Sequence, residues 1–197
     1  MRIVVAGVLG CLFASLAAGE ARCEVDPGIR AFVERWESKA KSIKALAKDD
    51  AAQIAAGCGE LTGSAFDFDT MLPDALPDVW AKLNASQRMA LAAAVAKKTA
   101  SDCVDRIRDY DGAPFAILGV RIADDGDQLA TADVRSAGGR DMHVTWRLRA
   151  ADPDHWKAVD MIVEGRSMTA SVRDRFNRIL LSRNGNLAAA IALMGNK

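Results

Sequence analysis

The chain has 197 residues, of which 50% are hydrophobic and 6% aromatic, a composition that suits one folded domain and excludes intrinsic disorder. Its 26 basic residues equal its 26 acidic ones, so the formal net charge is zero. No charge excess therefore favours nucleic acid or an anionic membrane surface as the main partner.

The amino terminus has the pattern of a secretory signal peptide. Arg2 supplies a positive charge, residues 3–18 are uncharged and mostly apolar, and small residues follow, with candidate cleavage after Gly19 or Ala21. The apolar run is shorter than the ~20 residues that span a bilayer, which favours a cleaved signal over an anchor. We therefore expect residues 1–21 to be removed on export and residues 22–197 to form a single domain.

Export would place Cys23, Cys58 and Cys103 in a compartment where disulfides form. Cys58 and Cys103 both fall in apolar stretches of helical character, so we favour a disulfide between them. Two separate buried thiols are the alternative. The chain has only two histidines, and no Cys or His cluster has zinc spacing, so neither a metal nor a cofactor is expected.

Helical periodicity extends from Pro27 to Tyr110. The inward face of the first predicted helix comprises Ile29, Phe32, Val33, Trp36, Ala40, Ile43 and Ala47. A shorter helix is predicted from Ala51 to Cys58, followed by a glycine-containing turn, with Pro73 and Pro77 interrupting regular structure. With Ser86 as its predicted N-cap, a long helix follows. Its predicted apolar stripe is Met89, Ala93, Ala96, Ala100, Cys103, Val104, Ile107 and Tyr110.

After Tyr110 the pattern changes to strands, which we predict over residues 115–123, 128–136, 141–150 and 155–164. The third strand alternates Met142, Val144, Trp146 and Leu148 with polar residues, the pattern of a strand with one buried face. Helices are predicted again over residues 171–183 and up to Met194. This order indicates an α+β fold, with a curved antiparallel sheet of about four strands. We expect N- and C-terminal helices to cover one face of the sheet and to enclose an apolar cleft.

Two ordered sets of residues resemble a known family. The first set runs from Phe66-Asp67-Phe68 through Trp80 and residues 84–88 to Tyr110-Asp111-Gly112 and Phe115. The second comprises residues 156–160, residues 164–168, Arg173, Phe176 and the tail from Gly185 to Leu193. In order and spacing they are similar to the MlaC family, also called toluene-tolerance auxiliary proteins, over about residues 27–195.

The resemblance implies a periplasmic carrier of phospholipid. Such a carrier moves lipid between an outer-membrane lipid complex and an inner-membrane complex that contains an ABC transporter, and we expect a monomer. Hopanoid-associated carriers share much of the same pattern and are one alternative. An envelope adaptor domain, whose cleft is filled by its own side chains, is the other.

An acyl-chain cavity needs a long apolar wall, because each buried methylene contributes ~0.8 kcal/mol. The predicted wall residues are Phe66, Phe68, Met71, Leu76, Trp80, Phe115, Val144, Trp146, Ile162, Met168 and Phe176. Ordinary core packing is the alternative for each. The predicted lipid head-group residues are Arg166, Ser167 and Arg173. Alternatively, Arg173 pairs with Asp160 or Glu164 and Arg166 is merely solvated.

Catalysis is not expected from this sequence. The run from Gly165 to Thr169 begins like a hydrolase nucleophile elbow, but the second glycine of that motif is missing. The predicted element order is also not the alternating α/β arrangement that the motif requires.

Overall fold

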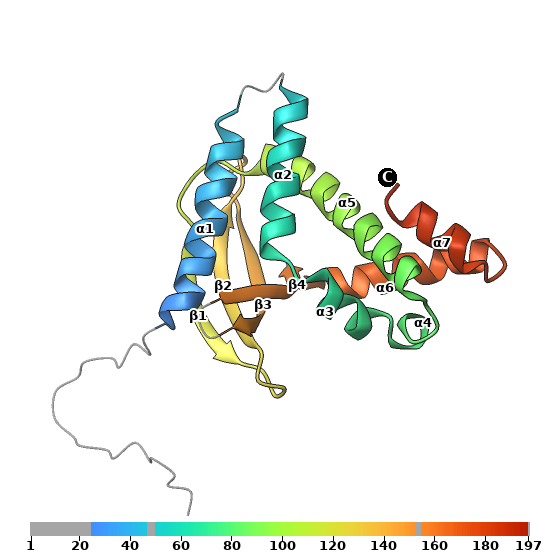
Figure 1. Ribbon diagram of the computed structural model, residues 1–197. Coiled ribbons are helices and arrows are strands. Elements are labelled where there is room, and N and C mark those ends of the chain that lie inside the picture. Colours follow the sequence, from blue (N-terminus) through green and yellow to red (C-terminus); the bar gives the residue numbers. More distant parts are fainter. Residues whose placement is uncertain (1–24, 47–49, 153–154, 197) are drawn as a thin grey trace, which may run out of the picture.

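The computed structural model describes residues 25–46, 50–152 and 155–196 (Figure 1). The predicted signal peptide, residues 1–21, lies outside the described residues, as do Cys23 and Ala47. No helix within the described ranges is long and apolar enough to cross a lipid bilayer.

The first two helices, α1 (Pro27–Lys44) and α2 (Ala51–Ala65), lie side by side in Figure 1. The Asp26 carboxylate starts α1 by accepting hydrogen bonds from the backbone N–H groups of Gly28 and Ile29 at 2.8 and 3.2 Å. The buried side of α1 is the predicted one, with Ile29, Phe32, Val33, Ala40 and Ile43.

The predicted end of α2 at Cys58 was wrong, since the helix continues through Gly59 and Gly63. A glycine inside a helix costs only about 1 kcal/mol relative to alanine, and tertiary contacts readily offset that. Here the contacts come from Leu61 and Thr62, which are both buried, and the Thr62 hydroxyl also donates to the Cys58 carbonyl at 2.8 Å.

Two short helices follow, α3 (Phe68–Ala75) and α4 (Pro77–Trp80). We predicted that Pro73 interrupts regular structure, but it lies inside α3. The helix tolerates it because Asp67 caps the amino end, accepting from the backbone N–H of Thr70 at 2.9 Å, and because Met71 and Leu72 are fully buried. Pro77 does separate α3 from α4, and occupies the first turn of α4, where its missing N–H costs nothing.

The long helix α5 (Ala85–Asp109) is capped by Asn84 and not by the predicted Ser86. Asn84 and Gln87 form a reciprocal capping box, with side chain to backbone distances of 2.9 and 3.0 Å. The inward line of α5 also differs from the predicted stripe, because Met89 is 67% exposed. The line consists of Leu91, Val95, Thr99, Cys103 and Ile107.

Five antiparallel strands form one sheet in the order β1-β2-β3-β4-β5. Their bounds are Ala116–Ile122, Gln128–Arg135, Asp141–Asp152, His155–Val163 and Arg166–Ser167. The register places Ala130 opposite Trp146 and Ala132 opposite Val144, so these side chains share the inner face. The α+β class and the antiparallel sheet are thereby confirmed, and the two-residue β5 adds a fifth strand.

The opposite face of the sheet carries an ion cluster around a buried carboxylate. Asp127 is only 4% exposed and accepts hydrogen bonds from Arg147 Nε at 2.6 Å and from Arg149 Nε at 2.7 Å. The bond to Asp127 raises the pKa of Arg149 above its usual value. These charges satisfy one another, which explains how a carboxylate can be buried here.

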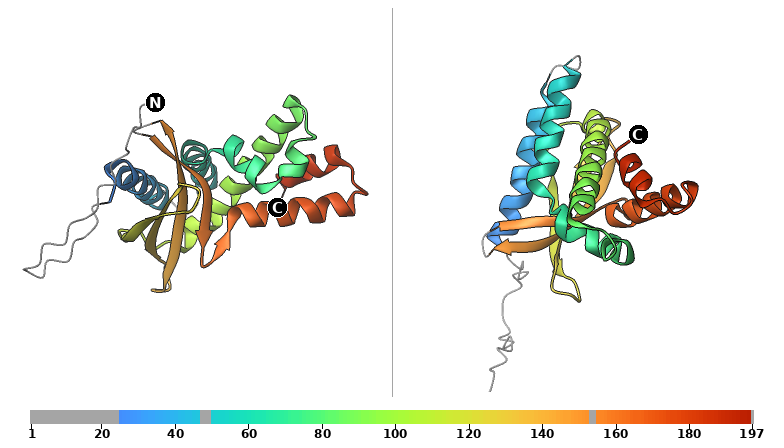
Figure 2. Two further views of the ribbon diagram at one scale, coloured as in Figure 1. Left: turned by 90° about the horizontal axis from the view of Figure 1, so that it is seen from below. Right: turned by 45° about the vertical axis from the view of Figure 1, so that its right-hand side comes forward.

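The last helices, α6 (Met168–Ser182) and α7 (Leu187–Met194), are joined by Asn184 and Gly185 with φ of 52° and 77°. Figures 1 and 2 show both helices beside α5, away from the α1–α2 pair. The structure therefore has two cores. The first joins the sheet to α1, α2 and α5. The second joins α3, α5, α6 and α7, and its fully buried members include Leu91, Phe176 and Met194.

Candidate functional site

A cavity of about 330 Å³ lies inside the first core, between the inner face of the sheet and the helices α1, α2 and α5. The sheet contributes Val134, Met142, Val144, Trp146, Met161 and Val163 to its wall. The helices contribute Trp36, Ala40, Leu61, Thr62, Thr99, Cys103 and Ile107. This volume falls in the range of ~300–1,000 Å³ that small-molecule sites occupy, and most residues of the wall are apolar.

Five predicted wall residues line the cavity: Phe66, Phe115, Val144, Trp146 and Met168. Val144 and Trp146 do so because the alternation of β3 turns both inward. Phe66 reaches the cavity from the end of α2, where it forms an isolated parallel bridge with Ala158 of β4.

The other six predicted wall residues lie elsewhere. Met71, Leu76, Trp80 and Phe176 belong to the second core, where they pack among α3, α4, α5 and α6. Phe68 stacks on Phe66 at 5.6 Å between ring centroids and contacts both cores without lining the cavity. Ile162 points to the opposite face of β4, since it alternates with Met161 and Val163, which do line the cavity.

An aromatic cluster forms one wall of the cavity around Trp146, which is 1% exposed. The Trp146 ring lies 5.8 Å from Trp36 and 6.2 Å from Phe115, both of which line the cavity, and 6.4 Å from Phe32. Such offset and edge-on pairs add stability beyond area burial and fix the rings in place. Trp36 was predicted to face inward but not to line the site, because periodicity does not show what lies opposite a side chain.

Tyr110 contributes a phenol ring to the same wall. Its hydroxyl donates to the Ala113 carbonyl. Burial, and secondarily the negative charges of Glu37 and Asp111, raise the pKa of Tyr110 to about 12. The phenol therefore stays neutral at physiological pH and adds no charge to the cavity.

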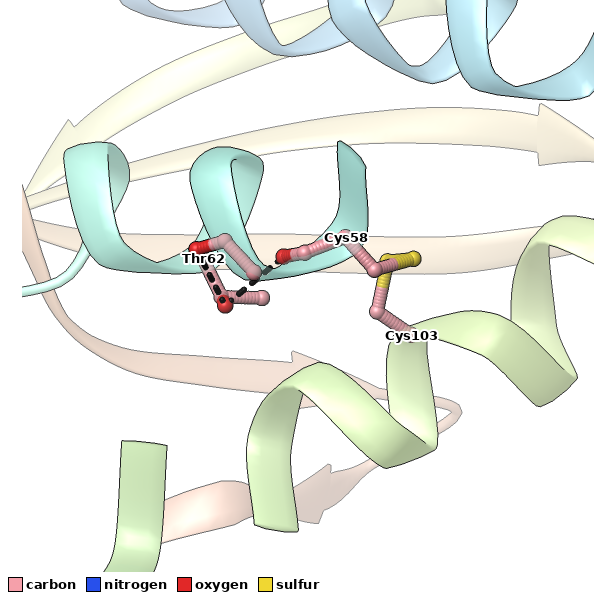
Figure 3. Close-up of a disulfide and its surroundings, with 4 residues drawn as sticks. Cys58, Thr62 and Cys103 are labelled. Atoms are coloured by element: carbon pink, nitrogen blue, oxygen red, sulfur yellow. Dashed lines mark hydrogen bonds between the residues drawn. A yellow bond between two sulfur atoms is a disulfide. The ribbon is translucent and has the colours of Figure 1, made fainter. Parts of the chain in front are cut away.

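A disulfide joins Cys58 of α2 to Cys103 of α5, with their Cα atoms 5.7 Å apart (Figure 3). This is the pair that the sequence favoured. Cys103 lines the cavity, and the hydrogen bond from Thr62 to the Cys58 carbonyl lies next to the bridge. The bridge therefore fixes the two helices that form one side of the cavity.

Polar side chains gather where the cavity opens to solvent. Asp102, Arg106, Arg166 and Ser171 all line the cavity and are all exposed, and we call these four residues the mouth. The Asp102 carboxylate forms an ion pair with Lys98 one turn earlier in α5. Of the predicted head-group residues only Arg166 belongs to the mouth, and sequence reasoning missed Arg106 and Ser171.

Ser167 and Arg173 do not line the cavity. Ser167 is the N-cap of α6, where its hydroxyl accepts from Ala170 N–H at 3.0 Å and donates to Asp160 at 2.7 Å. Arg173 is exposed and lies 3.5 Å from Asp174, so its suggested pairing with Asp160 or Glu164 was also wrong.

The described wall residues show no nucleophile beside a base. The hydroxyls of Thr62, Thr99 and Ser171 donate to backbone carbonyls of their own helices at 2.8, 2.9 and 2.8 Å. His143 and His155 pair with Asp133 and Asp152 away from the cavity. The described part of the chain also holds no group of three or more His, Cys, Asp or Glu placed to bind a metal ion. The site is built for apolar contact.

Comparison with known proteins shows the family of the chain and solved structures of similar fold, one of which is described below. The family model described as MlaC protein matches residues 31–196. No curated protein sequence matches the chain significantly. The structure is that of the phospholipid-binding protein from Ralstonia solanacearum in complex with a phospholipid. It shares 15% sequence identity with a TM-score of 0.63, over 85% of this chain and 92% of that one, which shows a common fold.

Proposed function

Because the chain belongs to the MlaC family, we propose that it is a phospholipid carrier that holds acyl chains in the cavity between the sheet and α1, α2 and α5. The observation that carries this proposal is the wall itself, which is apolar and aromatic and whose hydroxyls are already bonded to backbone. The phospholipid bound to the Ralstonia protein of the same fold supports the choice of ligand.

The cavity is suited to this task on energetic grounds. Burying about ten methylene groups contributes ~8 kcal/mol at ~0.8 kcal/mol each, before the costs of association are subtracted. A wall with unpaired polar groups would lose part of this gain, because each such group favours water over hydrocarbon. The neutral Tyr110 and the bonded Thr62 and Thr99 avoid that loss, and the Trp146 indole N–H is the one buried polar side-chain group of the described wall without a partner.

The carrier acts in the periplasm as a monomer, after removal of residues 1–21. It moves phospholipid between an outer-membrane complex and an inner-membrane complex that contains an ABC transporter. The family and the signal-like amino terminus support this role. The protein acts by binding and release and not by catalysis.

Lipid analysis of cavity-filling variants tests the proposal. Ala40 of α1 lines the cavity, so Ala40→Phe should fill it, while Ala93→Phe places the same ring on the exposed side of α5. Val144→Trp fills the cavity from the sheet side as an independent variant. Each protein is exported with its own amino terminus, and the lipid it retains is measured by native mass spectrometry and after organic extraction.

We expect about one phospholipid per molecule in the wild type and in Ala93→Phe, and a loss of most of it in the filling variants, with unchanged circular dichroism. Extraction of a hopanoid would identify the alternative ligand. A wild-type protein that carries no lipid, and takes up none from detergent micelles, would contradict the carrier function and favour an adaptor domain.

A further inference from the structure

We propose that Arg106 and Arg166 form a head-group site at the mouth that selects phospholipids whose head group carries a net negative charge. This inference rests on the proposed function, since it concerns the end of a lipid whose acyl chains occupy the cavity. It adds a preference among phospholipids that the apolar wall cannot provide.

The two arginines reach the mouth from different elements. Arg106 lies in the last turn of α5, one turn before Tyr110. Arg166 follows the turn at Glu164 and Gly165, whose φ of 50° and 75° reverse the chain so that Arg166 pairs with Val163 across β4 and β5. Directly paired residues share a face of the sheet, and both Val163 and Arg166 line the cavity. The two guanidinium groups therefore approach one opening from two sides.

Neither guanidinium has an ion-pair or hydrogen-bond partner among the described residues. Other arginines of the molecule do, because Arg135 binds Asp141, and Arg147 and Arg149 bind Asp127. The mouth contains one carboxylate, Asp102, and this carboxylate is already paired with Lys98. In a chain of zero formal net charge, the mouth is thus left with two uncompensated positive charges.

A second recess extends the positive region beyond the mouth. It measures about 190 Å³, shares Thr99, Asp102, Met168 and Ser171 with the main cavity, and opens between α5 and α6. Besides the Lys98–Asp102 ion pair of α5, its wall carries Arg175 and Arg178 of α6. Cations therefore flank the opening on the α6 side as well, which favours an anion at this position.

Head-group chemistry explains why this arrangement discriminates. Guanidinium groups bind phosphate oxygens through paired N–H donors. A zwitterionic head group places an ammonium next to its phosphate, and two arginines repel that ammonium. A head group such as glycerol carries no opposing charge. Because the mouth is open to solvent, the two arginines together should give only a modest preference for the anionic lipid, roughly fivefold to tenfold.

The test is a competition between phosphatidylglycerol and phosphatidylcholine with identical acyl chains. Delipidated mature protein is incubated with both lipids at equal concentration in micelles of a neutral detergent, and the bound lipids are counted by native mass spectrometry. The wild type should bind the glycerol lipid in roughly fivefold to tenfold excess. Arg106→Gln/Arg166→Gln should bind the two lipids equally while its total bound lipid stays near that of the wild type.

Arg173→Gln/Arg183→Gln is the matched control, because it removes the same charge from exposed positions within α6 and at its C-cap, outside the cavity wall. It should keep the wild-type ratio. The preference should also shrink at high salt, since the contacts are exposed. Equal binding by the wild type, or an unchanged ratio in Arg106→Gln/Arg166→Gln, overturns the head-group site and leaves the carrier function standing. Absence of both lipids from the wild type overturns the carrier function itself.

Discussion

Cys103 lines the cavity while its sulfur is bonded to Cys58, so the disulfide between these two residues is part of the wall and also the link between α2 and α5. The bridge closes a loop with a sequence separation of 45 residues. Its neighbours on the wall, Leu61 and Thr62, belong to α2, and Thr99 and Arg106 belong to α5. The geometry of one side of the cavity thus depends on one covalent bond.

Removing the disulfide should lower the stability of the fold. The chain-entropy model gives about 4 kcal/mol for a loop of this size, and measured values are commonly about 2–4 kcal/mol. We expect Cys58→Ala/Cys103→Ala, in a Cys23→Ala background, to lower the free energy of unfolding by about that amount in urea titrations. Reductant should destabilise the parent protein equally and leave the double variant unaffected. Equal stability of both proteins in oxidising buffer would contradict a bridge in the native state.

The amino end of α5 permits a comparison of two neighbouring polar residues. Asn84 caps the helix through its side chain, whereas the exposed Ser86 lies within the first turn. We expect Asn84→Ala to lower the free energy of unfolding by about 1 kcal/mol, because the backbone N–H of Gln87 loses its acceptor. Ser86→Ala should change it by less than about 0.5 kcal/mol. The reverse order of effects in thermal or urea unfolding would restore Ser86 as the cap.

Tyr110 makes the free energy of unfolding depend on pH in the alkaline range. The native pKa of about 12 exceeds the ordinary value of ~10, so between these values the unfolded chain releases the phenol proton while the native chain keeps it. Stability from this residue is complete below pH ~10 and is lost as the pH rises toward 12. Tyr110→Phe should therefore show a shallower loss of unfolding free energy over this range than the wild type.

The same titration can be observed directly, because Tyr110 is the only tyrosine in the sequence. Ultraviolet absorbance of tyrosinate should report half-ionisation near pH 12 in the folded protein and near pH ~10 in denaturant. Half-ionisation of Tyr110 near pH ~10 in the folded protein would show that the phenol is not buried as described.

Much of the fold follows from local sequence. The alternation through Met142, Val144, Trp146 and Leu148 predicted β3 and its buried face, because side chains of a strand alternate between faces. The predicted helix end at residue 183 also has a local cause, since Asn184 and Gly185 both adopt the positive φ that these residue types tolerate. The capping box of Asn84 and Gln87 could also have been predicted from the sequence, but we chose Ser86 as the N-cap instead.

The sequence does not show how the apolar residues are divided between the two cores. Helical periodicity shows that Met71 and Phe176 face inward, but it does not show which neighbouring layer they face. Both belong to helices that pack on α5, whose inward line passes from the second core at Leu91 and Val95 to the cavity at Thr99 and Cys103. Arg106 was missed for a related reason. Nothing in the sequence distinguishes an exposed helical arginine beside a cavity from one that faces only solvent.

The four tryptophans provide a way to locate the acyl chains. Trp36 and Trp146 line the cavity, whereas Trp80 and Trp156 do not. Trp80 lies under the Arg88 guanidinium at 5.3 Å, and Trp156 packs beside Gly28 at the start of α1. Bromine atoms on an acyl chain quench indole fluorescence only at short range, so brominated phospholipid reports which of the four rings it contacts.

We expect brominated phospholipid to quench the wild-type fluorescence strongly relative to the same lipid without bromine. Trp80→Phe/Trp156→Phe, which keeps the two cavity rings, should be quenched by a larger fraction than the wild type. Trp36→Phe/Trp146→Phe should lose most of the quenching, and Trp36→Phe alone serves as a milder variant if removal of Trp146 impairs folding. Strong quenching that persists in Trp36→Phe/Trp146→Phe would place the acyl chains outside the cavity, because only Trp80 and Trp156 remain to report them.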